Sequence, residues 1–173
     1  GANQAFAMPW EVCYNIAYPP SNRRAGLRLL LAQSVLGAGL AFGEPVAIDV
    51  DALGEVSFER DGYRFDSETR LVTLLEDRQF ILRGNSTAIG VFVRKNVKNV
   101  TLNALKIENK MGEERAHPGT PISLEDGAEV VFTLENKNTL VAAPHCAAIE
   151  VDTLANLTIV DDQEGGRLSA FGG

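Results

Sequence analysis

The chain has 173 residues, of which 45% are hydrophobic and 23% are charged, and it carries a formal net charge of −7. The length fits a single domain with a sizeable core, and the composition excludes an intrinsically disordered chain. The acidic balance excludes nucleic acid as the expected partner, because phosphate binding needs a clustered positive surface.

The first 45 residues differ from the rest and are predicted to form a capping segment (1–45) ahead of a β domain (46–173). Apolar residues recur at helical spacing from Leu27 to Leu40, and glycines ahead of Pro45 end this pattern, which predicts one helix. We expect the apolar side of this helix to cover the first strands of the domain. A targeting remnant over residues 25–42 is the alternative, since two arginines precede the apolar run. The run is too short and too rich in glycine to predict a membrane span.

Strand-like alternation begins at Val46, and a turn is predicted at Asp61-Gly62 between two alternating segments. Tyr63 follows this turn, with Arg60 and Arg64 near it, and it is the ring that we expect to be most exposed. An exposed ring beside polar groups is the kind of surface that binds the apolar face of a sugar. Tyr63, Arg60, Arg64 and Trp10 are therefore the candidate ligand-binding residues.

The stretches Thr120–Leu134 and Cys146–Val160 repeat one pattern of apolar and polar residues at an offset of 27 residues. Apolar residues alternate with polar ones in both copies, as half-buried strands require. A looser copy covers Val91–Ile107 at an offset of 30 to 31. We expect matched residues to lie one above the other on adjacent parallel strands, with Phe132 in the core. The matched pairs include Ile122 with Ile149, Val130 with Leu157, and Phe132 with Ile159.

A repeat of this length predicts a stack of similar units, because no single unit can bury its own apolar face. Short strands joined by bends predict an all-β fold, namely a short right-handed parallel β-helix (solenoid) with the N-terminal helical segment as its cap. The stretch "GRLSAFGG", which contains Phe171, is apolar, and neither a charged block nor a helical pattern follows it. It predicts self-association through the C-terminal coil, most simply as a homodimer.

Acidic residues cluster between Asp161 and Gly166, where Asp161, Asp162 and Glu164 are candidate ligands for a calcium ion. Hard cations bind several oxygens from one flexible loop, although this stretch lacks the regular D-x-D spacing of a calcium loop. Solvated turn acids are the alternative interpretation. Two more alternatives stay open at Cys13 and Cys146, which either form a disulfide bridge or include a small buried thiol at Cys146.

The second half of the chain combines an apolar ladder, "NTL" at Asn138–Leu140, a small-residue turn with Cys146, a second ladder and a Gly-Gly ending. In this combination the chain from Glu55 to Gly173 resembles the right-handed β-helix repeats of large secreted or surface-anchored Firmicutes proteins. Those proteins are often described as containing carbohydrate-binding domains. The resemblance implies the β-helix fold, a secreted or cell-surface location and a polysaccharide or surface glycan as the partner, but it specifies no ligand.

The sequence therefore predicts an extracellular, non-catalytic binding or adhesion module for a polysaccharide or a cell surface. One alternative is a polysaccharide lyase or hydrolase of the pectin-degrading kind, which a carboxylate-lined cleft with calcium would favour. A further alternative is a structural stalk or assembly unit. Flat sides with an exposed aromatic ring would favour glycan binding, whereas featureless sides with apolar ends would favour assembly.

Overall fold

The computed structural model describes residues 43–109, 119–161 and 165–173. This part of the chain contains thirteen strands. They are β1 (Val46–Asp49), β2 (Phe58–Arg60), β3 (Tyr63–Asp66), β4 (Leu71–Leu74), β5 (Gln79–Ser86), β6 (Gly90–Val93), β7 (Asn99–Glu108), β8 (Ile122–Leu124), β9 (Glu129–Glu135), β10 (Lys137–Val141), β11 (Ile149–Val151), β12 (Asn156–Asp161) and β13 (Arg167–Phe171).

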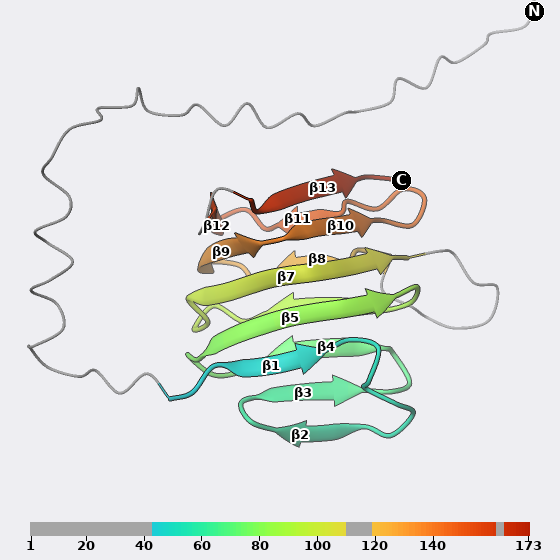
Figure 1. Cartoon of the computed structure of the whole chain (residues 1–173), viewed down its shortest axis with the longest axis vertical. Coiled ribbons are helices and arrows are strands. Elements are labelled where there is room, and N and C mark those ends of the chain that lie inside the picture. The colour runs from blue at the N-terminus through green and yellow to red at the C-terminus, as the bar shows by residue number, and fades with distance from the viewer. Residues whose placement is uncertain (1–42, 110–118, 162–164) are drawn as a thin grey trace, which may run out of the picture.

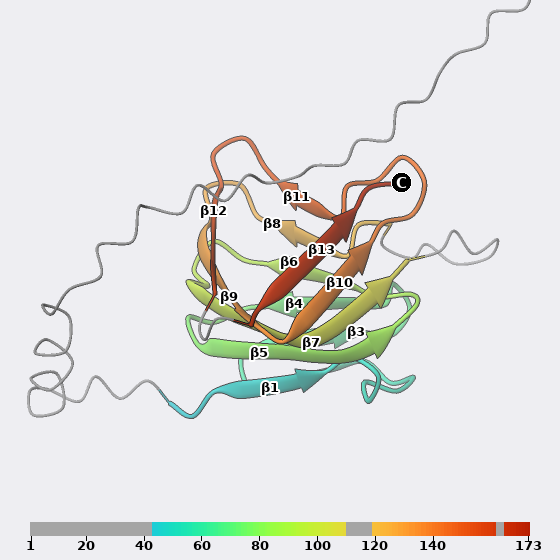
Figure 2. The same ribbon diagram turned by 45° about the horizontal axis from the view of Figure 1, so that its top comes forward.

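The strands form two sheets that face each other across the core (Figure 1, Figure 2). The first sheet has seven strands in the order β1-β5-β7-β10-β13, with β9 pairing β7 and β12 pairing β9. The second sheet has six strands in the order β11-β8-β6-β4-β3-β2. From β4 onward the chain alternates between the two sheets, so each pass adds parallel strands to both. We call the last of these passes, β11 with β12 and β13, the last layer.

The prediction of a short right-handed parallel β-helix is wrong, although the all-β class is confirmed. Both sheets are open, and the second is mixed, because β2, β3 and β4 pair antiparallel. The reason lies in the turn at Asp61-Gly62, whose φ angles of 50° and 78° are those of a tight hairpin turn. That turn, which the sequence did predict, reverses the chain where a coil of parallel strands would have to continue. The predicted helical cap lies outside the described residues.

The register predicted from the repeat is confirmed. Ile122 pairs with Ile149 on adjacent parallel strands, and Val130 and Phe132 pair with Leu157 and Ile159 in the same way. The looser upstream copy is confirmed on β6, where Val91 and Val93 pair with Ile122 and Leu124 at the predicted offset of 31. It is wrong on β7, where Val100 pairs with Phe132 at an offset of 32 and not at 30 to 31. A side-chain period of two therefore places every second residue of these strands toward the core.

The core lies between the two sheets and consists almost entirely of aliphatic and phenylalanine side chains. Phe65, Phe80 and Phe132 are each 0% exposed. The buried polar exceptions include Asn138, which is also 0% exposed. Its side chain accepts a hydrogen bond from the Leu105 N–H at 2.8 Å and donates toward the Glu135 carbonyl oxygen at 3.1 Å. These bonds satisfy one backbone group on β7 and one at the bend between β9 and β10, so the amide fits an otherwise apolar interior.

The end of the molecule near β2 and β3 is closed by aromatic packing. The rings of Phe58 and Tyr63 meet edge to face with centroids 5.6 Å apart, and Phe65 lies 5.8 Å from Phe58. The guanidinium of Arg60 lies over the ring of Phe58 at 4.5 Å. Inward-facing residues at this end, including Ile48 and Val50 at 1% exposure, are therefore shielded from water.

No helix in the part of the chain that the structure describes has the length and apolar character needed to cross a membrane.

Candidate functional site

The opposite end of the molecule exposes the inward-facing side of the last layer, which we call the end face. Its residues occupy the positions that form the core one layer below, and each pairs in register with a residue that is at most 4% exposed. The end face consists of Ile149, Val151, Leu157, Ile159, Leu168 and Ala170.

Exposure separates the end face from the layer beneath it. Val151 is 41% exposed, whereas its partner Leu124 is 3% exposed. Leu157 and Ile159 are half-buried, while Val130 and Phe132, their partners, are 2% and 0% exposed. The side chains are of the same kind, so the difference arises because no described strand lies beyond the last layer.

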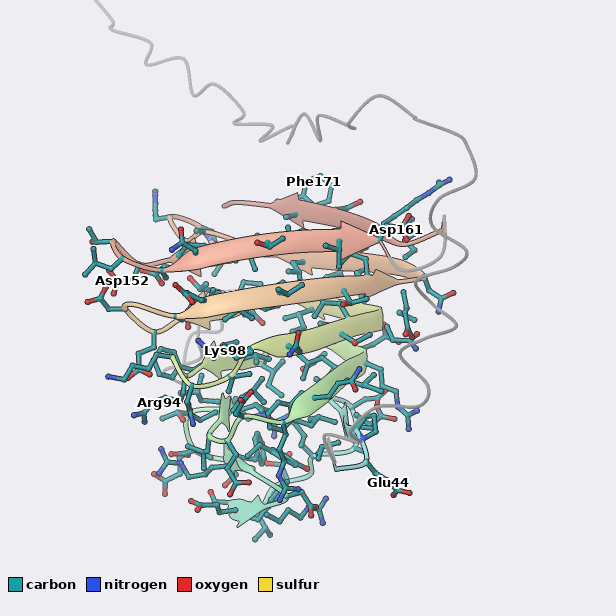
Figure 3. The ribbon with its side chains drawn as sticks, turned by 90° about the vertical axis from the view of Figure 1, so that its left-hand side faces the viewer. Glu44, Arg94, Lys98, Asp152, Asp161 and Phe171 are labelled. Carbon is teal, nitrogen blue, oxygen red and sulfur yellow. The ribbon has the colours of Figure 1, made fainter. Side chains whose placement is uncertain are left out.

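Further exposed apolar residues surround the end face. Leu154, Val160 and Phe171 are 68%, 39% and 51% exposed. Among the residues that the structure describes, one more large hydrophobic residue is exposed. It is Val56, which precedes β2 at the closed end. Figure 3 shows Phe171, Asp152 and Asp161 together at one end of the molecule and Glu44 toward the other. Contiguous apolar surface of this kind marks an interaction site more often than scattered single residues do.

Backbone hydrogen-bonding groups add to the exposed surface. Within the described chain, β11 pairs only with β8, β12 only with β9, and β13 only with β10. Each of these strands therefore presents one unpaired edge of N–H and C=O groups beside the apolar side chains. An edge of this kind is a template for pairing with another strand.

The last layer is held in place by hydrogen bonds to the layer below. The backbone N–H groups of Arg167 and Asn156 donate to the carbonyl oxygens of Asn136 and Ala128 at 2.8 and 2.7 Å. The N–H of Ala142 donates to the Phe171 carbonyl oxygen at 2.9 Å, and that of Leu154 to the Asp126 carboxylate at 3.1 Å. The end face is thus a preformed surface.

The rim of the end face is acidic. Among its described residues, Glu150, Asp152 and Asp161 are exposed acids and Arg167 is an exposed base. The centre of the surface is apolar and its border is charged, which is the usual anatomy of a protein interface.

The candidate ligand-binding residues do not form the predicted sugar-binding surface. Tyr63 is 3% exposed, so the expectation of an exposed ring is wrong. It is the first residue of β3, and its pairing with Leu74 directs the side chain into the core. Arg60 and Arg64 are exposed nearby, and Arg60 forms an ion pair with Asp61 at 4.0 Å. Trp10 lies outside the described residues.

The calcium hypothesis rests mainly on residues that the structure does not describe. Asp161 ends β12 and accepts a hydrogen bond from the Gly166 N–H at 3.0 Å, whereas Asp162 and Glu164 lie outside the described part. Among the described residues, no three His, Cys, Asp or Glu side chains gather where they could hold a metal ion. A half-open hollow of about 380 Å³ lies beside this corner and is lined by Leu134, Glu135, Asn136, Gly165 and Gly166. Calcium binding stays a prediction.

Cys146 lies on a different edge of the molecule. It is a half-buried free thiol, packed so closely on Gly119 that a side chain at that position would overlap its sulfur. Cys13 lies outside the described residues. The adjacent His145 is exposed, and no described nucleophile is paired with it.

Sequence reasoning identified part of the end face and missed the rest. The apolar stretch around Phe171 was recognised, but the sequence pattern did not indicate that Val151 in the end face, or Leu154 and Val160 beside it, would be exposed. The 27-residue offset indicates which residues face inward, yet it contains no signal for whether a further strand covers them. The resemblance to secreted repeat proteins likewise stays a prediction. The chain matches no protein-family model, no curated protein and no solved structure.

Proposed function

We propose that this domain is a non-catalytic assembly module that binds another β-sheet surface through its end face. The observation that carries the proposal is the exposure of inward-facing residues in the last layer. Val151 at 41%, against 3% for Leu124 directly below it, is the clearest case. Covering such a surface removes apolar area from water, and each Å² contributes about 25 cal/mol before the costs of association.

Strand addition is the binding mode that fits this surface. Main-chain hydrogen bonds to the open edges of β11, β12 and β13 would supply affinity. The alternating apolar side chains, such as Leu157 and Ile159, would supply the contact surface for side chains of the partner. Neither contribution requires a cleft or a catalytic residue.

Glycan binding has less support than assembly. The predicted sugar platform depended on an exposed Tyr63, and this ring is buried. The exposed ring among the described residues is Phe171, which lies at the border of the end face and not on a flat polar side. A secreted or cell-surface location stays a prediction from sequence resemblance.

A peptide that copies the layer below tests the proposal. We would label a synthetic peptide of residues 122–134, "ISLEDGAEVVFTL", and measure its binding to the full chain by fluorescence anisotropy. Saturable binding is expected, and it should weaken by about tenfold or more when Val151→Asp or Phe171→Asp places a charge on the surface.

The control variant is Val56→Asp, which changes an apolar and even more exposed residue at the opposite end. It should bind the peptide as the unmodified protein does, and a scrambled peptide should not bind. A chain that binds no peptide and also stays monomeric at high concentration would contradict the proposed function.

A further inference from the structure

We infer that the partner of the end face is a second copy of this chain, joined end to end as a two-fold dimer. The inference rests on the proposed function and deepens it by naming the occupant. Its starting point is geometric, because the end face contains two separate strand edges. β11 ends the second sheet, and β12 with β13 end the first.

The cross-section of the molecule restricts what can cover both edges. A single extended peptide would pair with the edge of one sheet and leave the other exposed. A partner that covers the whole face needs two facing sheets at the same separation, with an apolar centre between them. A second copy has this cross-section, so its end face can pair both edges and cover residues such as Ile149 and Leu168 at once.

The closed end of the molecule decides between a dimer and a filament. Head-to-tail stacking would require an end face to meet the opposite end, which is formed by the edge of β1 and by the β2–β3 hairpin. The inward-facing residues Ile48, Tyr63 and Phe65 at that end are only 1%, 3% and 0% exposed. Charged side chains on β2, Glu59 and Arg60, are exposed along that edge, and edge charges of this kind oppose strand pairing. End-face-to-end-face contact is therefore the favoured arrangement, and it closes after two copies.

The last layer, with the end face at its centre, is large enough for a stable dimer interface. The described residues of the last pass, 147–161 and 165–173, number about 24, and standard interfaces involve roughly 20 to 30 residues on each side. Among the described residues of the rim, the acids Glu150, Asp152 and Asp161 outnumber the base Arg167, so two rims that meet repel each other. Added salt should screen this repulsion and strengthen the dimer, whereas it would weaken binding to a basic partner.

Sedimentation velocity of the full chain tests the inference over about 1 to 100 µM protein, the range in which a micromolar dimer dissociates. We expect a dimer that dissociates on dilution and is stabilised by salt. Val151→Asp and Phe171→Asp should each raise the dissociation constant by about tenfold or more, while Val56→Asp should leave it unchanged. Circular dichroism would establish that each variant is folded.

Hydrogen exchange supplies a second readout that does not depend on a variant folding. Backbone amides of β11 and β13 should become more protected at high protein concentration, while those of β2 should not. A folded protein that stays monomeric throughout this range would overturn the inference, and if it still binds the 122–134 peptide, the proposed function survives. A dimer that both end-face variants form as well as the unmodified chain would place the interface elsewhere and would also overturn it.

Discussion

Gly84 interrupts β5 with a φ of 92°, and the carboxylates of Asp49 and Asp51 lie where its side chain would be. A Cβ at this position would be 2.5 Å from Asp49 Oδ1 and 2.8 Å from Asp51 Oδ1. The register between β5 and β7 shifts at this point, between Leu82 and Gly84, and only glycine adopts a φ of this sign without strain. Gly84 therefore leaves the space that the two carboxylates occupy.

Gly84→Ala should destabilise the protein by about 1 to 3 kcal/mol, through backbone strain and crowding of the two carboxylates. The measurement is the free energy of unfolding from urea denaturation. Gly127→Ala is the matched control, because Gly127 also has a positive φ, 73°, but nothing lies within 4 Å of its added methyl group. If both variants lost the same stability, crowding by the acids would play no part.

The two carboxyl groups beside Gly84 shift each other's pKa in opposite directions. The hydrogen bond that a protonated Asp49 donates to Asp51 raises the pKa of Asp49 above its ordinary value of 3.8, and the negative charge of Asp51 acts the same way. The same hydrogen bond lowers the pKa of Asp51. Oδ1 of Asp49 is shielded from solvent and accepts no hydrogen bond, so a proton shared with Asp51 is the arrangement that satisfies it.

Asp49→Asn should raise the unfolding temperature at neutral pH and have little effect in mild acid. The raised pKa means that the contribution of Asp49 to stability is full below its ordinary value and is lost as pH rises through the folded-state value. An amide at position 49 donates to Asp51 at any pH, so the gain appears on the alkaline side. The measurement is thermal unfolding followed across this pH range.

Glu125→Gln provides the comparison of opposite sign. Its carboxylate accepts hydrogen bonds from the Lys95 N–H at 2.7 Å and from Arg94 at 2.9 Å, and the Lys95 bond is the main cause of its lowered pKa. Its contribution is therefore present above the ordinary value and is lost as pH falls through the lowered one. The variant should lose stability at neutral pH and approach the unmodified protein in acid. Parallel pH profiles for the two variants would contradict both assignments.

The buried side chain of Asn138 on β10 forms hydrogen bonds to the neighbouring strands β7 and β13, so one residue connects three successive passes of the chain. Its oxygen accepts from Leu105 on β7, and its amide nitrogen lies 3.3 Å from the Arg167 carbonyl oxygen on β13. The same nitrogen lies 3.3 Å from the carbonyl oxygen of Asn136, whose φ of 60° marks the bend between β9 and β10. The bend is therefore stabilised from inside by a side chain, in addition to the backbone bond between the Arg167 N–H and the Asn136 carbonyl oxygen.

Asn138→Asp should cost about 3 to 5 kcal/mol at neutral pH, because a buried carboxylate would then face carbonyl oxygens. The loss should shrink in acid, where the protonated acid can donate again. Asn99→Asp is the matched control, since that side chain is exposed on β7 and its change should stay within about 0.5 kcal/mol. Both values come from chemical denaturation at two pH values, and an equally small loss for both would show that Asn138 does not hold the bend.

At the scale of the whole molecule, the two ends of the sheet pair differ in how well they shield the core from water. Leu140 and Leu168 lie on the adjacent strands β10 and β13 and both face inward, but Leu140 is 0% exposed and Leu168 is half-buried. Their chemistry is identical. Only the position in the stack separates them.

Leu140→Ala should therefore cost about 2 to 5 kcal/mol, as a buried large-to-small change does, and Leu168→Ala should cost clearly less in dilute solution. The cost at Leu168 should rise with protein concentration as the end face becomes covered, while that at Leu140 should not change. Thermal unfolding at two protein concentrations measures both. A cost at Leu168 that does not depend on concentration would count against a covered end face.

The sequence by itself determined the local features of this protein. Alternation with a period of two identified the strands, the 27-residue offset predicted the pairing of Phe132 with Ile159, and Asp61-Gly62 predicted a turn. The strands and the turn were predictable because each depends on neighbours in sequence: side-chain direction follows from the strand pleat, and tight turns from residues that tolerate positive φ. The pairing was predictable because the repeated apolar pattern restricts the register of strands that share one buried face. The same signals could not show that Tyr63 faces inward, because its burial depends on pairing with β4.

Only the tertiary structure decided which apolar residues remain in contact with water. Ile122 and Ile149 occupy matching places in the repeat and differ in sequence context by little, yet one is fully buried and the other forms part of the end face. A residue in this stack is buried only when strands lie on both sides of its layer. A repeated sequence pattern shows which residues of a layer face inward, but it does not show whether another layer covers them. The antiparallel hairpin that closes one end and the strand edges left open at the other arise from long-range pairing, so the candidate site became visible only in the folded chain.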